Sequence, residues 1–330
     1  MRTHNNAFIG LICFLIATVS FSESERPVSQ ITIHVRADDG IMVTGIVVGV
    51  GTFWKHVPGE GFGRDEHKTV TGKTDANGFV TLSIPSLTGD VGFSPHLPLS
   101  GFYWDRGDRI KFTNAVAGKW QPWNPTVELQ LKRIGNPIPM YAKKYGERKT
   151  VKIPEIGKAI GFDLMQSDWV APYGSGETAD FIFKLDSRVT GDKDFDATLS
   201  VAFSNVGDGI QSVYALPFKG SQLRLSRKAP ADGYEDNLVR RTHCSPGEQI
   251  YRENREDQNY VFRVRTKKDD KGNIVSALYG KIHGEIGWWQ NSVIRFTYYL
   301  NPTPNDRNLE FDPNKNLFKN LSPLEKVSEP

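Results

Sequence analysis

Cysteine is almost missing from this chain of 330 residues, which contains only Cys13 and Cys244. Cys13 lies in an N-terminal apolar run that we expect to be removed, so a single thiol remains and no intramolecular disulfide is possible. Small exported domains with insufficient cores usually depend on disulfides. The chain is therefore expected to fold around hydrophobic cores that are large enough to be stable without cross-links.

Apolar runs long enough to cross a bilayer are also missing. The N-terminal run, residues 7–19, falls short of the ~20 apolar residues that a spanning helix needs, which argues against a membrane anchor. It follows the basic Arg2 and ends in Ser20-Phe21-Ser22, a pattern typical of a secretory signal. We expect residues 1–22 to be a signal peptide cleaved after Ser22, with Ser20 as the alternative. The mature protein is then secreted or periplasmic and has no membrane span.

An excess of one charge is missing as well, because 41 basic residues face 38 acidic ones for a net charge of +3. This balance gives no electrostatic reason to expect nucleic acid or an anionic membrane as a partner. Residues 72–74 read Gly-Lys-Thr, as at the end of a phosphate-binding loop, but His67 stands where that loop needs glycine. We expect no cofactor.

Strand patterns dominate what is present. Residues 30–35 and 127–132 alternate between apolar and polar side chains, and a turn sequence at 75–78 separates two further strand-like runs. Short strands spaced by turns are typical of a β-sandwich. We expect one such domain over residues 23–134.

The second half predicts another sandwich over residues 158–300 and leaves three irregular segments around it. Prolines at 137, 139 and 154 exclude a central strand, so residues 135–157 are expected to be a linker or an edge crossing. Residues 219–259 are polar and aperiodic and are expected to be an insertion of surface loops, and residues 301–330 an irregular tail. The predicted fold class is all-β, with two β-sandwich domains in tandem.

One ten-residue motif carries a family resemblance. Residues 73–82 read Lys-Thr-Asp-Ala-Asn-Gly-Phe-Val-Thr-Leu. This stretch resembles the hairpin of carboxypeptidase regulatory-like domains, and the resemblance extends over roughly residues 28–134. It departs from the family pattern after Gly40, where Pro-Val and a Gly-Ala step are usual and Ile41-Met42-Val43 stands instead. The resemblance implies a prealbumin-type β-sandwich that acts as an accessory, non-catalytic module of an exported protein.

Acidic residues provide the candidate catalytic site. Asp163, Asp168, Glu177 and Asp180 surround an aromatic stretch that contains Trp169 and Tyr173. Two carboxylates facing one cleft suit glycoside hydrolysis, and their separation sets the mechanism. A hydrolase is therefore an alternative, whereas the simpler interpretation is that these carboxylates stabilise loops.

Asp192, Asp194 and Asp196 provide the candidate metal site, because they alternate as in the start of a calcium loop. The full loop needs glycine at its sixth position and an acidic residue at its twelfth, where Ala197 and Phe203 stand. We expect a solvated turn, with a looser calcium site as the alternative.

Tryptophans provide the candidate binding site. Trp104, Trp120 and Trp123 lie in loop-like stretches beside polar residues, where indole rings can stack on sugars. The competing interpretation is that they pack in the core, because tryptophan usually buries most of its surface. We expect a non-catalytic exported protein with a binding or structural role, whose partner is a polysaccharide or another exported protein.

Overall fold

The structure, a computed structural model, describes residues 26–59, 61–103, 105–215, 221–253 and 255–330. Within these ranges almost all regular structure is β-strand, and the one helix is the short 3-10 turn Pro313–Lys315. The predicted all-β class is confirmed. No helix in these ranges is long and apolar enough to cross a membrane. The predicted signal peptide, residues 1–22, lies outside the described residues.

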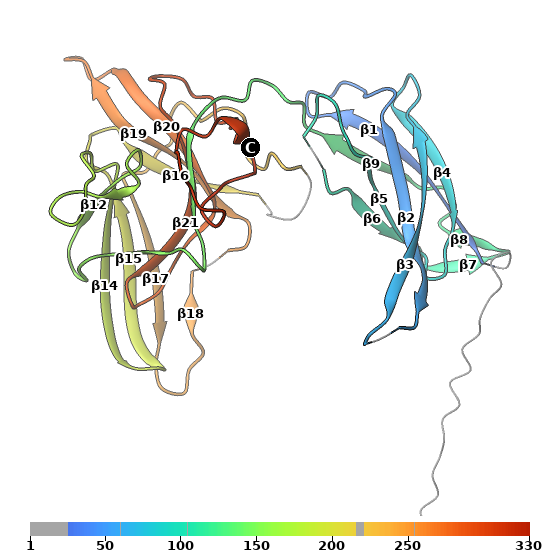
Figure 1. The fold of residues 1–330 in the computed structure, drawn as a ribbon, viewed down its shortest axis with the longest axis horizontal. Coiled ribbons are helices and arrows are strands. Elements are labelled where there is room, and N and C mark those ends of the chain that lie inside the picture. Colours follow the sequence, from blue (N-terminus) through green and yellow to red (C-terminus); the bar gives the residue numbers. More distant parts are fainter. Residues whose placement is uncertain (1–25, 60, 104, 216–220, 254) are drawn as a thin grey trace, which may run out of the picture.

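Two β-sandwiches lie side by side (Figure 1). The first is made of two sheets, which we number 1 and 2. Sheet 1 consists of β1 (Val28–Ala37), β4 (Phe79–Pro85), β7 (Asn114–Val116), β8 (Lys119–Gln121) and β9 (Thr126–Leu131). Sheet 2 consists of β2 (Val47–Val57), β3 (Arg64–Lys73), β5 (Asp90–Pro95) and β6 (Asp108–Lys111), in the order β3-β2-β5-β6.

The core between sheets 1 and 2 follows from strict alternation. In β1 every second residue is buried, and Ile31, Ile33 and Val35 are fully enclosed. They face Val48 and Val50 of β2, which belong to the same core. Successive side chains of a strand point to opposite faces. The buried residues of β1 therefore all point into the core between the two sheets.

The motif at residues 73–82 links the two sheets, whereas the sequence predicted a hairpin there. β3 belongs to sheet 2 and β4 to sheet 1, so the chain crosses the sandwich at the turn. Thr74, which is buried, donates to the carbonyl of Val43 at 2.8 Å. Asp75 accepts the N–H of Phe79 at 2.9 Å, and Gly78 takes a φ of +79° that favours glycine.

The second sandwich is larger. Its sheet 3 consists of β10 (Tyr141–Tyr145), β11 (Val151–Lys152), β16 (Gly209–Tyr214), β19 (Gln258–Lys268), β20 (Ile274–Trp288) and β21 (Val293–Asn301). Its sheet 4 consists of β12 (Ile160–Asp163), β13 (Asp168–Trp169), β14 (Phe181–Gly191), β15 (Asp194–Ala202), β17 (Asn237–Cys244) and β18 (Tyr251–Arg252). Aromatic rings fill the space between the sheets. Phe162 packs edge-on against Trp169, for example, with the centres of the two rings 5.1 Å apart.

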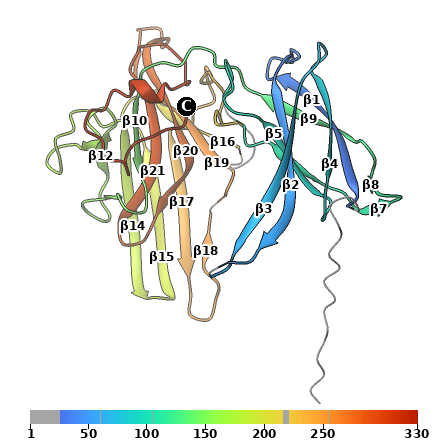
Figure 2. The same ribbon diagram turned by 45° about the vertical axis from the view of Figure 1, so that its right-hand side comes forward.

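Two segments outside the strands that the sequence predicted, the expected surface loops and the expected linker or edge crossing, contribute strands. Residues 219–259, expected to be surface loops, contain β17 and β18, which extend sheet 4 (Figure 2). Only Leu238, Thr242 and Cys244 of β17 are buried, and the half-buried Arg240 and the exposed Arg241 between them hide the alternation. Residues 135–157 supply β10 and β11, which pair with β21 at the edge of sheet 3.

The C-terminal segment, residues 302–330, covers the outer face of sheet 3. Leu309 and Phe311 are fully buried there, with Tyr299 of β21 in the same small core. The segment also runs along the free edge of β10, where the N–H of Leu317 donates to the carbonyl of Met140 at 2.9 Å. An exposed strand edge is prone to pairing with other chains, so this cover protects sheet 3.

The two sandwiches meet at a buried carboxylate. Glu310 is 1% exposed and accepts the hydroxyl of Tyr103 at 2.5 Å and the N–H of Gly135 at 2.7 Å. Arg227 of the second domain pairs with Asp38 of the first. Burial and the adjacent Glu310 carboxylate raise the pKa of Tyr103 well above its usual range. The contact is polar, and its buried groups have hydrogen-bond partners.

Candidate functional site

Asp163, the first of the candidate catalytic acids, ends β12 and is 2% exposed. One carboxylate oxygen accepts the N–H groups of Met165 at 2.8 Å and Gln166 at 3.0 Å. The other accepts those of Glu177 at 3.0 Å and Thr178 at 2.9 Å. Asp163 therefore ties two separate loops to the end of its strand.

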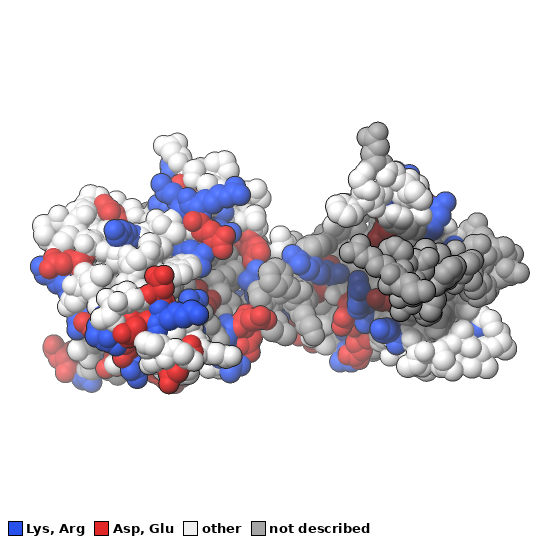
Figure 3. All heavy atoms as spheres, turned by 90° about the horizontal axis from the view of Figure 1, so that it is seen from below, with Lys and Arg blue, Asp and Glu red and all other residues white. Residues whose placement is uncertain are grey.

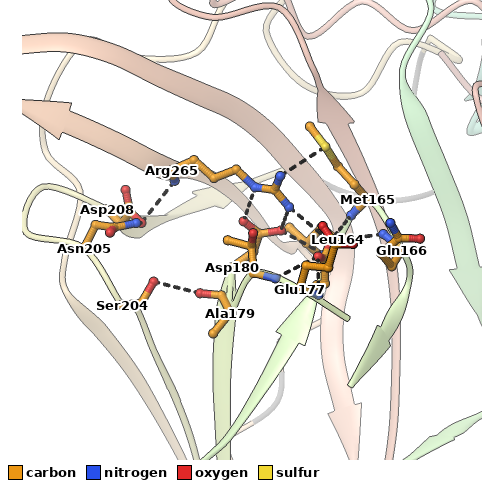
Figure 4. Close-up of polar contacts among 12 residues, drawn as sticks. Leu164, Met165, Gln166, Glu177, Ala179, Asp180, Ser204, Asn205, Asp208 and Arg265 are labelled. Carbon is orange, nitrogen blue, oxygen red and sulfur yellow. Dashed lines mark hydrogen bonds and ion pairs between the residues drawn. The ribbon is translucent and has the colours of Figure 1, made fainter. Parts of the chain in front are cut away.

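Arg265 joins Asp163 to Asp180. Figure 4 shows the guanidinium group of Arg265 directed at Asp180. Its Nη2 donates to Asp163 at 3.0 Å, and its Nε donates to Asp180 at 2.8 Å. A bulge in β19 between Val264 and Lys267 gives Arg265 a φ of +55°. The N–H of Arg265 donates to Asp208 at 3.1 Å, which helps to fix this unusual backbone conformation.

Burial opposes the ionisation of both acids. It raises the pKa of Asp180, and the hydrogen bond and charge of Arg265 act against that rise. In Asp163 burial also acts upward, but the backbone N–H donors outweigh it and hold the pKa below its usual range. Hydrogen bonds to the charged form favour it, so Asp163 is a carboxylate at neutral pH.

Asp168 and Glu177 lie outside this buried group. Asp168 accepts both the N–H and the hydroxyl of Ser175 at 2.8 Å, which closes the loop between β13 and β14. Glu177 has an exposed side chain and contributes only its backbone N–H to Asp163. The structure thus brings together two of the four candidate acids, around an arginine and with almost no exposed surface. Such an arrangement orders the loops around two acids that are almost fully buried.

The candidate tryptophans differ in their surroundings. Trp120 donates its indole N–H to the carbonyl of Ser86 at 2.9 Å and packs against the core of the first domain. Its ring lies over Gly89, where an added Cβ would come within 2.9 Å of it. Trp123 is 36% exposed, and the ammonium of Lys119 lies 4.8 Å from the centre of its ring. Trp104 lies outside the described residues.

The candidate metal ligands are engaged elsewhere or exposed. Asp196 forms a two-pronged pair with Arg241 at 2.6 and 3.0 Å, and Asp194 lies 3.5 Å from Arg188. Asp192 is an exposed residue of the turn between β14 and β15. In the described part of the chain, no three His, Cys, Asp or Glu residues are grouped so that they could hold a metal ion.

Millimolar calcium is therefore expected to leave the melting temperature of the protein unchanged, because binding would have to break the Asp196–Arg241 pair. Differential scanning fluorimetry with calcium and with EDTA measures this directly. A rise in Tm with calcium that disappears in Asp196→Asn would instead establish the looser calcium site.

Two buried basic residues, Lys281 and His283, lie on the outer face of sheet 3 and were not among the candidates. Lys281 of β20 is 0% exposed, and its ammonium has no hydrogen-bond partner among the described residues. Burial lowers the pKa of Lys281 to about 7, although Glu310 and Glu329 act in the opposite direction. Its Nζ lies 4.7 Å from the centre of the Tyr299 ring.

His283 lies two residues further along the same strand. Its Nδ1 is 2.9 Å from the hydroxyl of Tyr299 and 3.7 Å from the carboxylate of Glu329. Burial lowers the pKa of His283 to about 3, against the effect of Glu329. Alternation in β20 indicates an outer face for both residues, and a sequence pattern does not reveal that the C-terminal segment covers that face.

No known protein family matches this sequence, and no curated protein matches it either. Among solved structures, the shaft pilin SpaA from Lactobacillus rhamnosus GG is 14% identical, with a TM-score of 0.21 over 56% of this chain and 90% of that one. BcpA, the major pilin subunit of Bacillus cereus, is 9% identical, with a TM-score of 0.21 over 86% of this chain and 99% of that one. Likeness at this level supports no argument about function. The resemblance to carboxypeptidase regulatory-like domains stays a prediction.

Proposed function

We propose that this chain is an exported, non-catalytic β-sandwich protein with a binding or structural role outside the cytoplasm. The N-terminal pattern of residues 1–22 supports export. The partner is a polysaccharide or another exported protein. A carbohydrate partner is the more specific form of this proposal, and the exposed ring of Trp123 beside Lys119 is compatible with it.

The observation that carries the non-catalytic part is the placement of Asp163 and Asp180. A general acid or base must lie within hydrogen-bond reach of the substrate proton that it transfers. Asp163 and Asp180 are 2% and 1% exposed, and their oxygens accept backbone N–H groups and Arg265. Their burial and partners explain their presence without a reaction.

When the full-length chain is expressed in an exporting host, the purified protein is expected to begin at Glu23. It is also expected to release no reducing ends from polysaccharides. Mass spectrometry of the mature N-terminus and a reducing-sugar assay on soluble xylan, mannan and β-glucan measure the two parts. Retention of residues 1–22 in the cytoplasm would contradict export. Sugar release that is lost in a folded Asp168→Asn variant would contradict the absence of catalysis. Asp168 is chosen because it is more accessible than Asp163 and Asp180.

The charge distribution agrees with a neutral partner. Lys and Arg are interspersed with Asp and Glu on the face seen in Figure 3, most clearly on the second domain. A surface of this kind does not attract a polyanion over long distances. Recognition of a partner by such a surface depends on local hydrogen bonds and on complementary shape.

A further inference from the structure

Three glycines form a strip without side chains on the outer face of sheet 2. Gly51 and Gly92 are partly exposed, whereas Gly49 is buried beside the side chains of Thr69 and Thr71. Gly49 and Gly51 belong to β2, and Gly92 of β5 pairs directly with Gly51. Val50 and Val91, which alternate with them, are fully buried in the core of the first domain. Successive residues of a strand point to opposite faces, so all three glycines face outward.

The fold does not require glycine at positions 49 and 92. None of the three has a positive φ, and a Cβ added at Gly92 would meet its first described atom only at 3.8 Å. At Gly49 the corresponding distance is 3.5 Å, whereas at Gly51 it is 3.2 Å, so a side chain there would have to displace Thr69. Gly280 of β20 differs, because a Cβ there would lie 2.2 Å from the ring of Phe262. Glycine weakens a strand interior, and where neither backbone nor packing demands it, it marks a close approach by a ligand or another backbone.

The glycine strip is the floor of a groove of about 930 Å3. Its sides combine hydroxyl, imidazole, amide and charged groups, contributed by Thr69, Ser94, His96, Asp108, Arg109 and Gln130. Ala215 and Arg224 of the second domain also line it, so the groove lies where the two sandwiches meet. Both hydrogen-bond donors and acceptors are therefore available along a floor without side chains.

The chemistry of the walls selects the class of ligand. The groove carries charges of both signs, because Arg106, Arg109, Lys132 and Arg224 line it together with Asp105, Asp108 and Glu128. Arg109 pairs with Asp90 at 3.1 Å and Arg224 with Glu329 at 2.8 Å. A polyanion would meet the three carboxylates, and a lipid tail would cover all of these charges, whereas a neutral ligand with many hydroxyls can use both donors and acceptors.

We propose that the groove over Gly51 and Gly92 binds a neutral polysaccharide. Its sugar rings lie flat on the backbone of these two glycines, and its hydroxyl groups bond to the polar side chains of the walls. The inference rests on the proposed binding role and names its site and ligand class. Of the candidate tryptophans that the structure describes, neither Trp120 nor Trp123 lines the groove.

Gly92→Val tests the proposal because it fills the floor without disturbing the fold. Valine favours strands, so the melting temperature is expected to be unchanged or higher. Ser200→Val on the outer face of β15 is the matched control, as it adds similar bulk to a different sheet. Thr69→Val removes one wall hydroxyl at nearly constant volume and provides a second variant.

The measurement is binding of the exported chain to an array of neutral and acidic oligosaccharides, with calorimetry on the best neutral one. Wild type and Ser200→Val are expected to bind neutral oligosaccharides, and Gly92→Val to bind about tenfold or more weakly, because a methyl-sized clash in a fitted site is sufficient for that loss. Thr69→Val is expected to weaken binding as well.

The proposal is overturned by the absence of binding to any neutral oligosaccharide, by unchanged affinity in Gly92→Val, or by a clear fall in its melting temperature. Loss of binding in Trp123→Ala but not in Gly92→Val also overturns it. These failures leave an exported, non-catalytic protein intact, whereas cleavage of the bound glycan would contradict the proposed function and keep the site.

Discussion

Arg265→Met is expected to lower the free energy of unfolding of the second domain by about 3–5 kcal/mol, because it leaves two buried carboxylates without their cation. Asp163 and Asp180 have side chains that are 3% and 0% exposed, so water cannot replace the guanidinium. Methionine tolerates the φ of +55° no worse than arginine does. The loss is therefore due to charge and hydrogen bonding. Urea unfolding followed by tryptophan fluorescence measures it, since Trp169 lies in the second core.

Arg241→Met is the matched control for this change. Arg241 also forms a two-pronged pair with an aspartate, Asp196, but its side chain is 53% exposed. Exposed pairs contribute little to stability, so its unfolding midpoint is expected to stay close to that of the wild type. Equal losses in the two variants would show that the buried cluster has no special importance for the fold.

Lys281→Met is expected to raise the melting temperature at pH 7 and to remove a pH dependence above it. Burial lowers the pKa of Lys281 to about 7 from 10.5. Between these two values the unfolded chain binds a proton that the folded chain does not. The unfolding free energy of the wild type therefore rises with pH in this window, by up to about 1.4 kcal/mol per pH unit. Methionine fills the same space and has no proton to gain.

Thermal unfolding between pH 7 and 10 tests this expectation. Lys184→Met is the control, because Lys184 lies on the outer face of sheet 4 with its side chain 43% exposed. The pH dependence should persist in Lys184→Met and be reduced in Lys281→Met. If both variants retain the wild-type slope, Lys281 is protonated in the folded protein and has an unrecognised partner.

The fold was more predictable than the site for a physical reason. Alternation identified β1 and β9, because one face of each is apolar and the other polar. It failed in β17, whose buried positions include Thr242 and Cys244, which follow two arginines. It also could not show that the chain changes sheets after Thr74, because a turn sequence does not specify which strand pairs with which.

The candidate acids were found by their spacing, and their roles depend on a residue far away in the sequence. Arg265 meets Asp163 and Asp180 only because a bulge in β19 turns its side chain toward the end of β12. Similarly, Glu310 reaches Tyr103 across the boundary between the domains. The glycines of the groove come from two strands that are about 40 residues apart in the sequence, and the pairing of Gly51 with Gly92 brings them together.

A double-mutant cycle between Arg265→Met and Asp180→Asn tests most directly the claim that the buried acids serve the fold. Removing Asp180 relieves part of the unpaired charge that Arg265→Met creates, so the double variant is expected to be more stable than the sum of the single losses implies, by about 0.5–3 kcal/mol. Strictly additive losses in urea unfolding would contradict the account, because they would mean that Arg265 and Asp180 do not stabilise one another.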